Sequence, residues 1–266
     1  MQISYVVSTM LFWWRENPLS FEQECEFLRS LGFGMELWPN IKGENDCRYN
    51  SRNWPRLKSA TDGMLVSMRS RNDNPTLEQW DEQIECAKLL GANIVTDPQS
   101  MGISDAEDDG KYDFAAEVVK MAELNKVKLC LETGDLRKLK QVGERFESVW
   151  YCLDTGYANI DTGYTFKQYV DDLAQRVAHL HLTDNYGQND DHEPPGLPGG
   201  IPQKDWEYLL TSLEKYDNNV IGSFEMSPCM PAVMIRRAVE FLFNTLKWPN
   251  RPKQQADRIS VGYNPV

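Results

Sequence analysis

Histidine is scarce in this sequence, and basic residues are outnumbered by acidic ones. The 266 residues include only three histidines, and 40 acidic against 28 basic residues give a formal net charge of −12. Nucleic-acid binding depends on a basic surface that displaces counterions from phosphates. The charge therefore argues against a nucleic-acid partner.

Nucleotide-binding and disulfide motifs are also missing. No GxGxxG or P-loop pattern follows a strand-like run, which counts against dinucleotide or nucleotide binding. None of the six cysteines forms a CxxC pair, and Cys130 and Cys152 lie within apolar runs. We expect buried thiols rather than disulfides, because thiols in such runs behave as small hydrophobic side chains.

No segment has the pattern of a signal peptide or a membrane span. The apolar N-terminal run MQISYVVSTMLFWW lacks a basic region and a small-residue cleavage site, and it is too short to cross a bilayer. We interpret it as a first core strand, and we expect a cytoplasmic location without a membrane partner. The hydrophobic content of 41% is typical of a globular protein.

Short β-rich runs alternate with longer amphipathic stretches along the whole chain. This alternation predicts a parallel sheet with crossover helices, and eight units favour a single (β/α)₈ TIM barrel over an open sheet. We expect one domain over residues 1–266, with about 248–266 as a surface tail. The expected strands are Ile3–Val7, Gly34–Trp38, Met64–Met68, Asn93–Val95, Val127–Leu131, Val149–Leu153, Val177–Leu182 and Val220–Phe224. The expected helices are Ser20–Leu31, Trp54–Ala60, Thr76–Leu90, Tyr112–Asn125, Thr165–Arg176, Lys204–Tyr216 and Ala232–Leu246.

The last four strands share one feature, which is that an apolar run stops at a side chain able to bind a metal. VKLCLE ends at Glu132, VWYCLD at Asp154, VAHLH at His181 and VIGSFE at Glu225. Active sites of barrels are built at the C-terminal ends of the strands. Three carboxylates and one imidazole meeting there favour a divalent cation, because unpaired buried charges are costly. This ligand set suits Mn²⁺, Co²⁺, Mg²⁺ or Zn²⁺.

The three histidines lie within fourteen residues of one another, at His179, His181 and His192. Side chains two residues apart in a strand point to the same side of the sheet. His181 is nearer the end of the strand and is the better ligand, whereas His179 should lie one layer deeper and make a core hydrogen bond.

These residues carry a family resemblance. HLHLTDNYGQNDDHEPPGLPGG resembles the seventh-strand motif of the sugar phosphate isomerase/epimerase family, the xylose isomerase-like barrels. LCLETGD, YCLDTGYA and GSFEMSP resemble its fifth, sixth and eighth strand motifs. The resemblance implies one divalent metal held by Glu132, Asp154, His181 and Glu225. It also implies that Glu132 and Glu225 act as acid and base on a sugar or sugar derivative.

Two departures limit what the resemblance implies. The sixth-strand motif of the family commonly reads Asp-x-x-His, whereas Tyr157 stands in the last position here. The segments Ser67–Arg71 and Val95–Gln99 lack the histidines of the multi-zinc DNA-repair barrels. We therefore do not expect a trinuclear zinc site.

Further side chains near the strand ends could contact a substrate. Rim packing or a surface ion pair explains those after the first four strands equally well, whereas Asp184 and His192 have the better claim because they belong to the seventh-strand motif. Asp184, which follows the seventh strand, could instead orient a metal ligand or a bound water. The substrate-binding candidates are Glu36, Trp38, Arg69, Asp97, Tyr157, Asp184 and His192, and Trp13 and Trp14 could stack on a sugar face.

Several functions remain open at this stage. The first is a metal-dependent isomerase or epimerase, and the second is a lyase that eliminates a group from a keto-sugar, a 3-keto-glycoside or a dehydroshikimate-like acid. A non-catalytic sugar-binding barrel and, more remotely, a DNA-repair nuclease complete the list. Arg69, Arg71 and Lys42 are scattered, which favours an unphosphorylated substrate, and a homo-oligomer remains possible.

Overall fold

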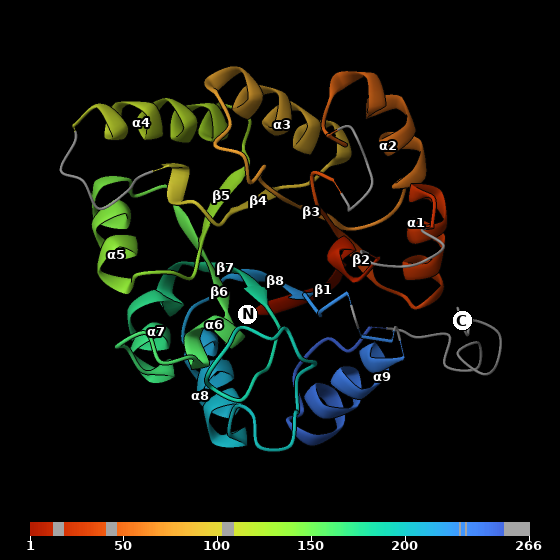
Figure 1. Ribbon diagram of the computed structural model, residues 1–266, viewed down its shortest axis with the longest axis vertical. Helices are drawn as coiled ribbons and strands as arrows, with labels where there is room; N and C mark the ends of the chain where they lie inside the picture. The colour runs from red at the N-terminus through yellow and green to blue at the C-terminus, as the bar shows by residue number, and fades with distance from the viewer. Residues whose placement is uncertain (13–18, 41–46, 103–108, 229, 232, 253–266) are drawn as a thin grey trace.

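Eight parallel strands form a closed barrel in the computed structural model, with helices around its outside (Figure 1). The structure describes residues 1–12, 19–40, 47–102, 109–228, 230–231 and 233–252. Each strand pairs with the next along the chain, and β1 pairs with β8 to close the ring. The predicted (β/α)₈ fold is therefore confirmed. The strands are β1 (Gln2–Ser8), β2 (Gly34–Leu37), β3 (Val66–Arg69), β4 (Ile94–Asp97), β5 (Lys128–Glu132), β6 (Trp150–Asp154), β7 (Val177–His181) and β8 (Asn219–Phe224).

Several outer helices begin at the capping residues that the sequence contains. Ser20, Thr76 and Thr165 each form a capping box with the glutamine three residues later, which satisfies backbone N–H groups at the helix start. Gly91 ends one helix in the left-handed conformation. The helices are α1 (Phe21–Ser30), α2 (Trp54–Ala60), α3 (Leu77–Leu90), α4 (Asp109–Leu124), α5 (Leu136–Arg145), α6 (Thr155–Asn159), α7 (Phe166–Leu173), α8 (Gln203–Glu214) and α9 (Met234–Val239), which continues as a π-helical turn, Glu240–Thr245.

The structure differs from the predicted elements in several places. The sequence pattern assigns no bounds to the helix after the fifth strand, which is α5, and the short helix α6 follows β6 directly. The predicted helix Ala232–Leu246 is α-helical only over Met234–Val239. Trp248 is 3% exposed and Tyr5 donates a hydrogen bond to the Pro249 carbonyl, so residues 248 and 249 pack against the barrel instead of joining a surface tail.

The interior of the barrel changes from apolar to polar along the strands. A small apolar cluster combines side chains from six strands, Val6, Ile94, Cys130, Cys152, Ala178 and Ile221. Two residues further along β5 and β6, the same face carries Glu132 and Asp154. These two carboxylates therefore lie at the C-terminal end of the barrel.

Most of the remaining core lies in the large apolar cluster that joins the strands to the surrounding helices. Cys25, Cys86, Cys130 and Cys152 are buried and Cys47 is partly buried, and no disulfide joins any two of these five within the described residues. Cys229 lies outside the described residues. Within the described part of the chain, no helix has the length and apolar character needed to cross a membrane.

Candidate metal centre

The four side chains at the ends of the last four strands converge on one point. Ligand atoms of Glu132, Asp154, His181 and Glu225 all lie within 4.8 Å of one another. His181 Nδ1 lies 2.8 Å from Glu225 Oε2, 3.4 Å from Glu132 Oε1 and 3.6 Å from Asp154 Oδ2. His181, Asp154 and Glu225 are buried, and Glu132 is partly exposed, so the cluster opens towards Glu132.

The hydrogen bonding of this cluster is incomplete in a way that fits a cation. His181 Nδ1 and Glu225 Oε2 are buried and have no hydrogen-bond partner among the residues that the structure describes, although they face each other. Buried polar atoms are normally satisfied, and each that is not carries a cost of about 1–3 kcal/mol. A nitrogen and three carboxylates with lone pairs on a common point form a donor set suited to one divalent ion.

Arg69 at the end of β3 ties the two glutamates together. Its Nη1 lies 2.9 Å from Glu225 Oε1 and its Nη2 lies 3.0 Å from Glu132 Oε2, while the guanidinium packs 4.3 Å above the Trp38 ring. Burial disfavours the charged form of Glu132, yet Arg69 and His181 hold its pKa below the usual range. Each glutamate therefore gives one oxygen to Arg69 and keeps the other for the cluster.

Asp154 is oriented by the segments that follow β6 and β7. Its Oδ1 accepts hydrogen bonds from the Thr183 hydroxyl at 2.9 Å and from the Tyr157 backbone amide at 3.0 Å, which leaves Oδ2 directed at His181. Burial disfavours its charged form, but the neighbouring His181 outweighs this and lowers the pKa of Asp154 to about 2. Tyr157 thus serves the site through its backbone, and its side chain is partly buried.

Glu36 and His179 lie beneath the cluster. Glu36 is fully buried, and its Oε1 lies 3.1 Å from His181 Nε2. His179 bonds with Ser67 Oγ at 3.1 Å and Cys152 Sγ at 3.3 Å, which places it one layer deeper, as the strand periodicity predicts. Glu36 is enclosed by protein groups and does not line the opening of the cluster, so a substrate hydroxyl entering there would not reach its carboxylate.

The sequence matches the family model described as xylose isomerase-like TIM barrel over residues 61–245. The chain belongs to this family. No curated protein of known function matches the sequence.

Solved structures share the fold at low sequence identity. D-psicose 3-epimerase in the presence of D-fructose is 14% identical, with a TM-score of 0.64 over 92% of this chain and 100% of that one. The IolI protein with a bound zinc atom is 13% identical, with a TM-score of 0.63 over 91% and 97%. A Thermus thermophilus protein, TTHB071, soaked with ZnCl₂, is 17% identical, with a TM-score of 0.61 over 90% and 96%.

The loop after β7 of this xylose isomerase-like barrel adds a second group of candidate ligands. His192 Nδ1 lies 3.0 Å from the Glu225 carbonyl oxygen, and its Nε2 lies 3.4 Å from Asp190 Oδ2. Asp154, Asp190 and His192 also bring ligand atoms within 4.8 Å of one another. Asp190 was missed from the sequence, although its spacing from His192 is a usable signal.

Two predicted substrate contacts of the barrel instead organise loops. The Asp184 carboxylate accepts hydrogen bonds from the backbone amides of Asn185, Gly196, Leu197 and Ile201. Asp97 accepts hydrogen bonds from the Ser70 hydroxyl and the Met101 amide. Neither belongs to the cluster of candidate ligands. Trp13 and Trp14 lie outside the described residues.

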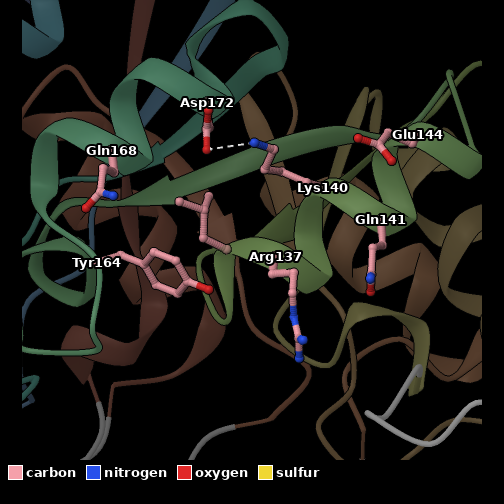
Figure 2. Close-up of a pocket in the computed structure, with 8 residues that line it drawn as sticks. Arg137, Lys140, Gln141, Glu144, Tyr164, Gln168 and Asp172 are labelled. Carbon is pink, nitrogen blue, oxygen red and sulfur yellow. Dashed lines mark hydrogen bonds and ion pairs between the residues drawn. The ribbon is translucent and has the colours of Figure 1, made fainter.

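Two pockets of the barrel lie apart from the four candidate ligands. One of about 250 Å³ lies between α5 and α7, where Lys140 Nζ contacts Asp172 Oδ2 at 3.0 Å (Figure 2). Another of about 420 Å³ is lined partly by Trp80, Asp97 and Phe114. The first has exposed, paired charges and offers no metal-binding cluster among the described residues, so the mouth of the barrel remains the better candidate site.

Proposed function

We propose that this chain is a divalent-metal-dependent sugar isomerase or epimerase that transfers a proton next to a carbonyl. The observation that carries the proposal is the convergence of Glu132, Asp154, His181 and Glu225 at the mouth of the barrel. The structural likeness to D-psicose 3-epimerase supports a sugar substrate. The net charge of −12 supports a small molecule over a nucleic acid.

These four residues would hold the metal. When bound, the metal would polarise a substrate carbonyl and stabilise the negative charge that develops on its oxygen. Mn²⁺, Co²⁺, Mg²⁺ and Zn²⁺ all suit the three carboxylates and one imidazole.

Glu132 and Glu225 are the proposed proton carriers. One carboxylate takes the proton from the carbon beside the carbonyl, and the other, in its protonated form, returns a proton to a substrate atom on the opposite side. Glu132 Oε2 and Glu225 Oε1 both contact Arg69, which holds the two carboxylates in place.

The pairing of the arginine side chains near the end of β3 favours an unphosphorylated substrate. Arg69 is already paired with two glutamates, and Arg71 Nη2 is paired with Asp73 Oδ2 at 2.7 Å. A phosphate would need several cationic or N–H donors that are not already engaged.

The test uses purified protein loaded with Mn²⁺ or Co²⁺ and a panel of unphosphorylated ketoses in D₂O. We expect deuterium to enter the substrate at the carbon beside the carbonyl, together with an isomer or epimer detectable by NMR. Release of water or an aglycone would instead indicate the lyase reaction. Failure of the wild-type protein to bind any of the four metals would contradict the proposal.

Glu132→Gln and Glu225→Gln should each abolish turnover, because an amide cannot accept and return the proton. Glu144→Gln is the matched control, since Glu144 is exposed on α5 and should leave the rate unchanged. Near-wild-type turnover in either site variant would show that its glutamate is not a proton carrier.

A further inference from the structure

One buried carboxylate lies on the far side of His181 from the candidate metal. Glu36 Oε1 is 3.1 Å from His181 Nε2, and it also accepts a hydrogen bond from the Thr96 hydroxyl at 3.3 Å. The Ser223 hydroxyl donates to Glu36 Oε2 at 2.8 Å. Glu36 comes from β2, across the barrel from β7, so the closed ring brings two distant segments together.

These contacts determine which nitrogen of His181 carries a proton. An ionised carboxylate can only accept hydrogen bonds, so Nε2 must be the donor in its contact with Glu36. The other nitrogen, Nδ1, then faces Glu132, Asp154 and Glu225 and can offer its lone pair to a metal. The arrangement is a carboxylate–histidine pair that points at the ion site.

The neighbouring histidine does not compete for this carboxylate. His179 Nε2 lies 3.7 Å from Glu36 Oε1, which is longer than a hydrogen bond, and its two nitrogens already bond with Ser67 and Cys152. Glu36 is therefore directed at His181.

We propose that Glu36 is a positioning residue that keeps the proton on His181 Nε2, so that His181 binds the metal through Nδ1. This inference rests on the proposed metal-dependent function. The negative charge behind the ring makes Nδ1 a stronger electron donor, and the hydrogen bond fixes the ring plane. Loss of such a partner typically costs about 10–100-fold in metal affinity.

The first measurement is the Zn²⁺ affinity of the full chain, by competition with a chelator. Glu36→Gln retains an acceptor for Nε2–H but loses the charge, and we expect affinity to fall about 10-fold. Glu36→Leu removes the acceptor too, and we expect a fall of about 100-fold. Ser223→Ala is the control, because it removes one hydrogen bond to Glu36 and keeps the carboxylate, so its affinity should stay close to the wild-type value.

The second measurement needs no variant and so does not depend on whether Glu36→Leu folds. In the Zn²⁺-loaded wild-type protein with ¹⁵N-labelled histidine, NMR should show His181 protonated at Nε2 and bound to zinc at Nδ1. Zinc binding through Nε2, or equal Zn²⁺ affinity in wild type and Glu36→Leu, would overturn the positioning role of Glu36 but not the proposed metal-dependent function. A wild-type protein that binds no metal would overturn the proposed function and, with it, this role.

Discussion

Arg69 brings a fixed positive charge to two of the candidate metal ligands. Its contacts with Glu132 and Glu225 are both 3.0 Å or shorter, and its side chain is 10% exposed. Without a metal, this guanidinium lies against both carboxylates and, together with His181, compensates their charge. Breaking a buried ion pair from one side is costly because it leaves an uncompensated charge behind.

Arg69→Met should therefore lower the free energy of unfolding of the metal-free protein by about 3–5 kcal/mol. Saturating Zn²⁺ should recover part of this loss, because a divalent ion replaces the missing positive charge. Chemical denaturation with and without Zn²⁺ measures both effects. Arg71→Met is the control, since it breaks an ion pair with the exposed Asp73 and should cost about 1 kcal/mol or less. Equal losses in the two variants would contradict the bridging role of Arg69.

His181 should give metal binding at the candidate site a pH dependence whose direction can be predicted. Burial disfavours its charged form, but the surrounding carboxylates, Glu225, Glu36 and Glu132 among them, raise the pKa of His181 well above 6.5 in the metal-free protein. A metal needs the lone pair on Nδ1, so binding must displace a proton at any pH below this raised pKa. Affinity should then increase by about tenfold per pH unit as pH rises towards it.

Calorimetric titration with Zn²⁺ in two buffers of different ionisation enthalpy measures this proton directly. At neutral pH we expect about one proton to be released for each metal bound. His181→Asn, which removes one candidate ligand and its proton, should bind Zn²⁺ more weakly, and the metal that still binds should release no proton from this position. Metal binding without proton release in the wild type would show that His181 is neutral before the metal arrives.

The candidate ligands could be predicted from the sequence, whereas their supporting residues could not. Glu132, Asp154 and His181 each end an apolar run, and the ends of parallel strands meet at one face of a barrel. Glu36 lies near the end of β2, but nothing in the linear pattern shows that its side chain lies beneath His181. That placement depends on strand register and side-chain depth, which emerge only when the ring closes.

At the scale of elements, the loop from 185 to 201 shows how much of the site depends on one carboxylate. Asp184 holds four backbone amides of this loop, which also carries His192 beside Glu225. Gly196 and Gly199 both adopt the left-handed conformation, with φ of +87° and +84°. They differ in space, because a Cβ at Gly196 would lie 2.5 Å from the Phe241 ring, whereas one at Gly199 would lie 3.9 Å from Tyr186.

Gly196→Ala should therefore destabilise the protein more than Gly199→Ala. Both variants incur the left-handed penalty of about 1–2 kcal/mol, but only the first also forces Phe241 to move. Urea unfolding compares the two free energies, and hydrogen exchange over 185–201 reports the loop itself. Equal losses would show that Phe241 shifts without cost and does not restrain the loop.

The bounds of helix α5 could not be assigned from the sequence, for a physical reason. Its sequence, LRKLKQVGER, is strongly charged and contains Gly143, a residue that lowers helix propensity. A Cβ at this position would overlap Tyr151 Oη and Arg176, so the glycine is needed for the helix to lie against β6. The usable signal was Asp135, whose side chain accepts a hydrogen bond from the Lys138 backbone amide as an N-cap.

At the scale of the whole molecule, closure of the barrel makes the site from both halves of the chain. The sequence motifs that indicated the family all lie after residue 127, yet Glu36 and Arg69 come from β2 and β3. Ser67 of β3 likewise bonds with His179 of β7. A metal held at this point would connect β5, β6, β7 and the end of β8, so its binding should stabilise the complete ring.

Metal binding should therefore raise the thermal unfolding temperature in a site-specific way. A ligand at 100 times its dissociation constant stabilises the native state by about 2.7 kcal/mol. For a chain of this size that corresponds to a shift of roughly 5–10 °C, since 1 kcal/mol moves the midpoint by about 2–4 °C. Thermal unfolding followed by circular dichroism, with Mn²⁺ or Zn²⁺ against a chelator, measures this shift in the unfolding temperature.

Asp154→Asn is the necessary control, because a chain with a net charge of −12 also attracts cations to its surface. The variant should lose most of the shift, whereas an equal shift in both proteins would indicate surface binding and count against the metal centre.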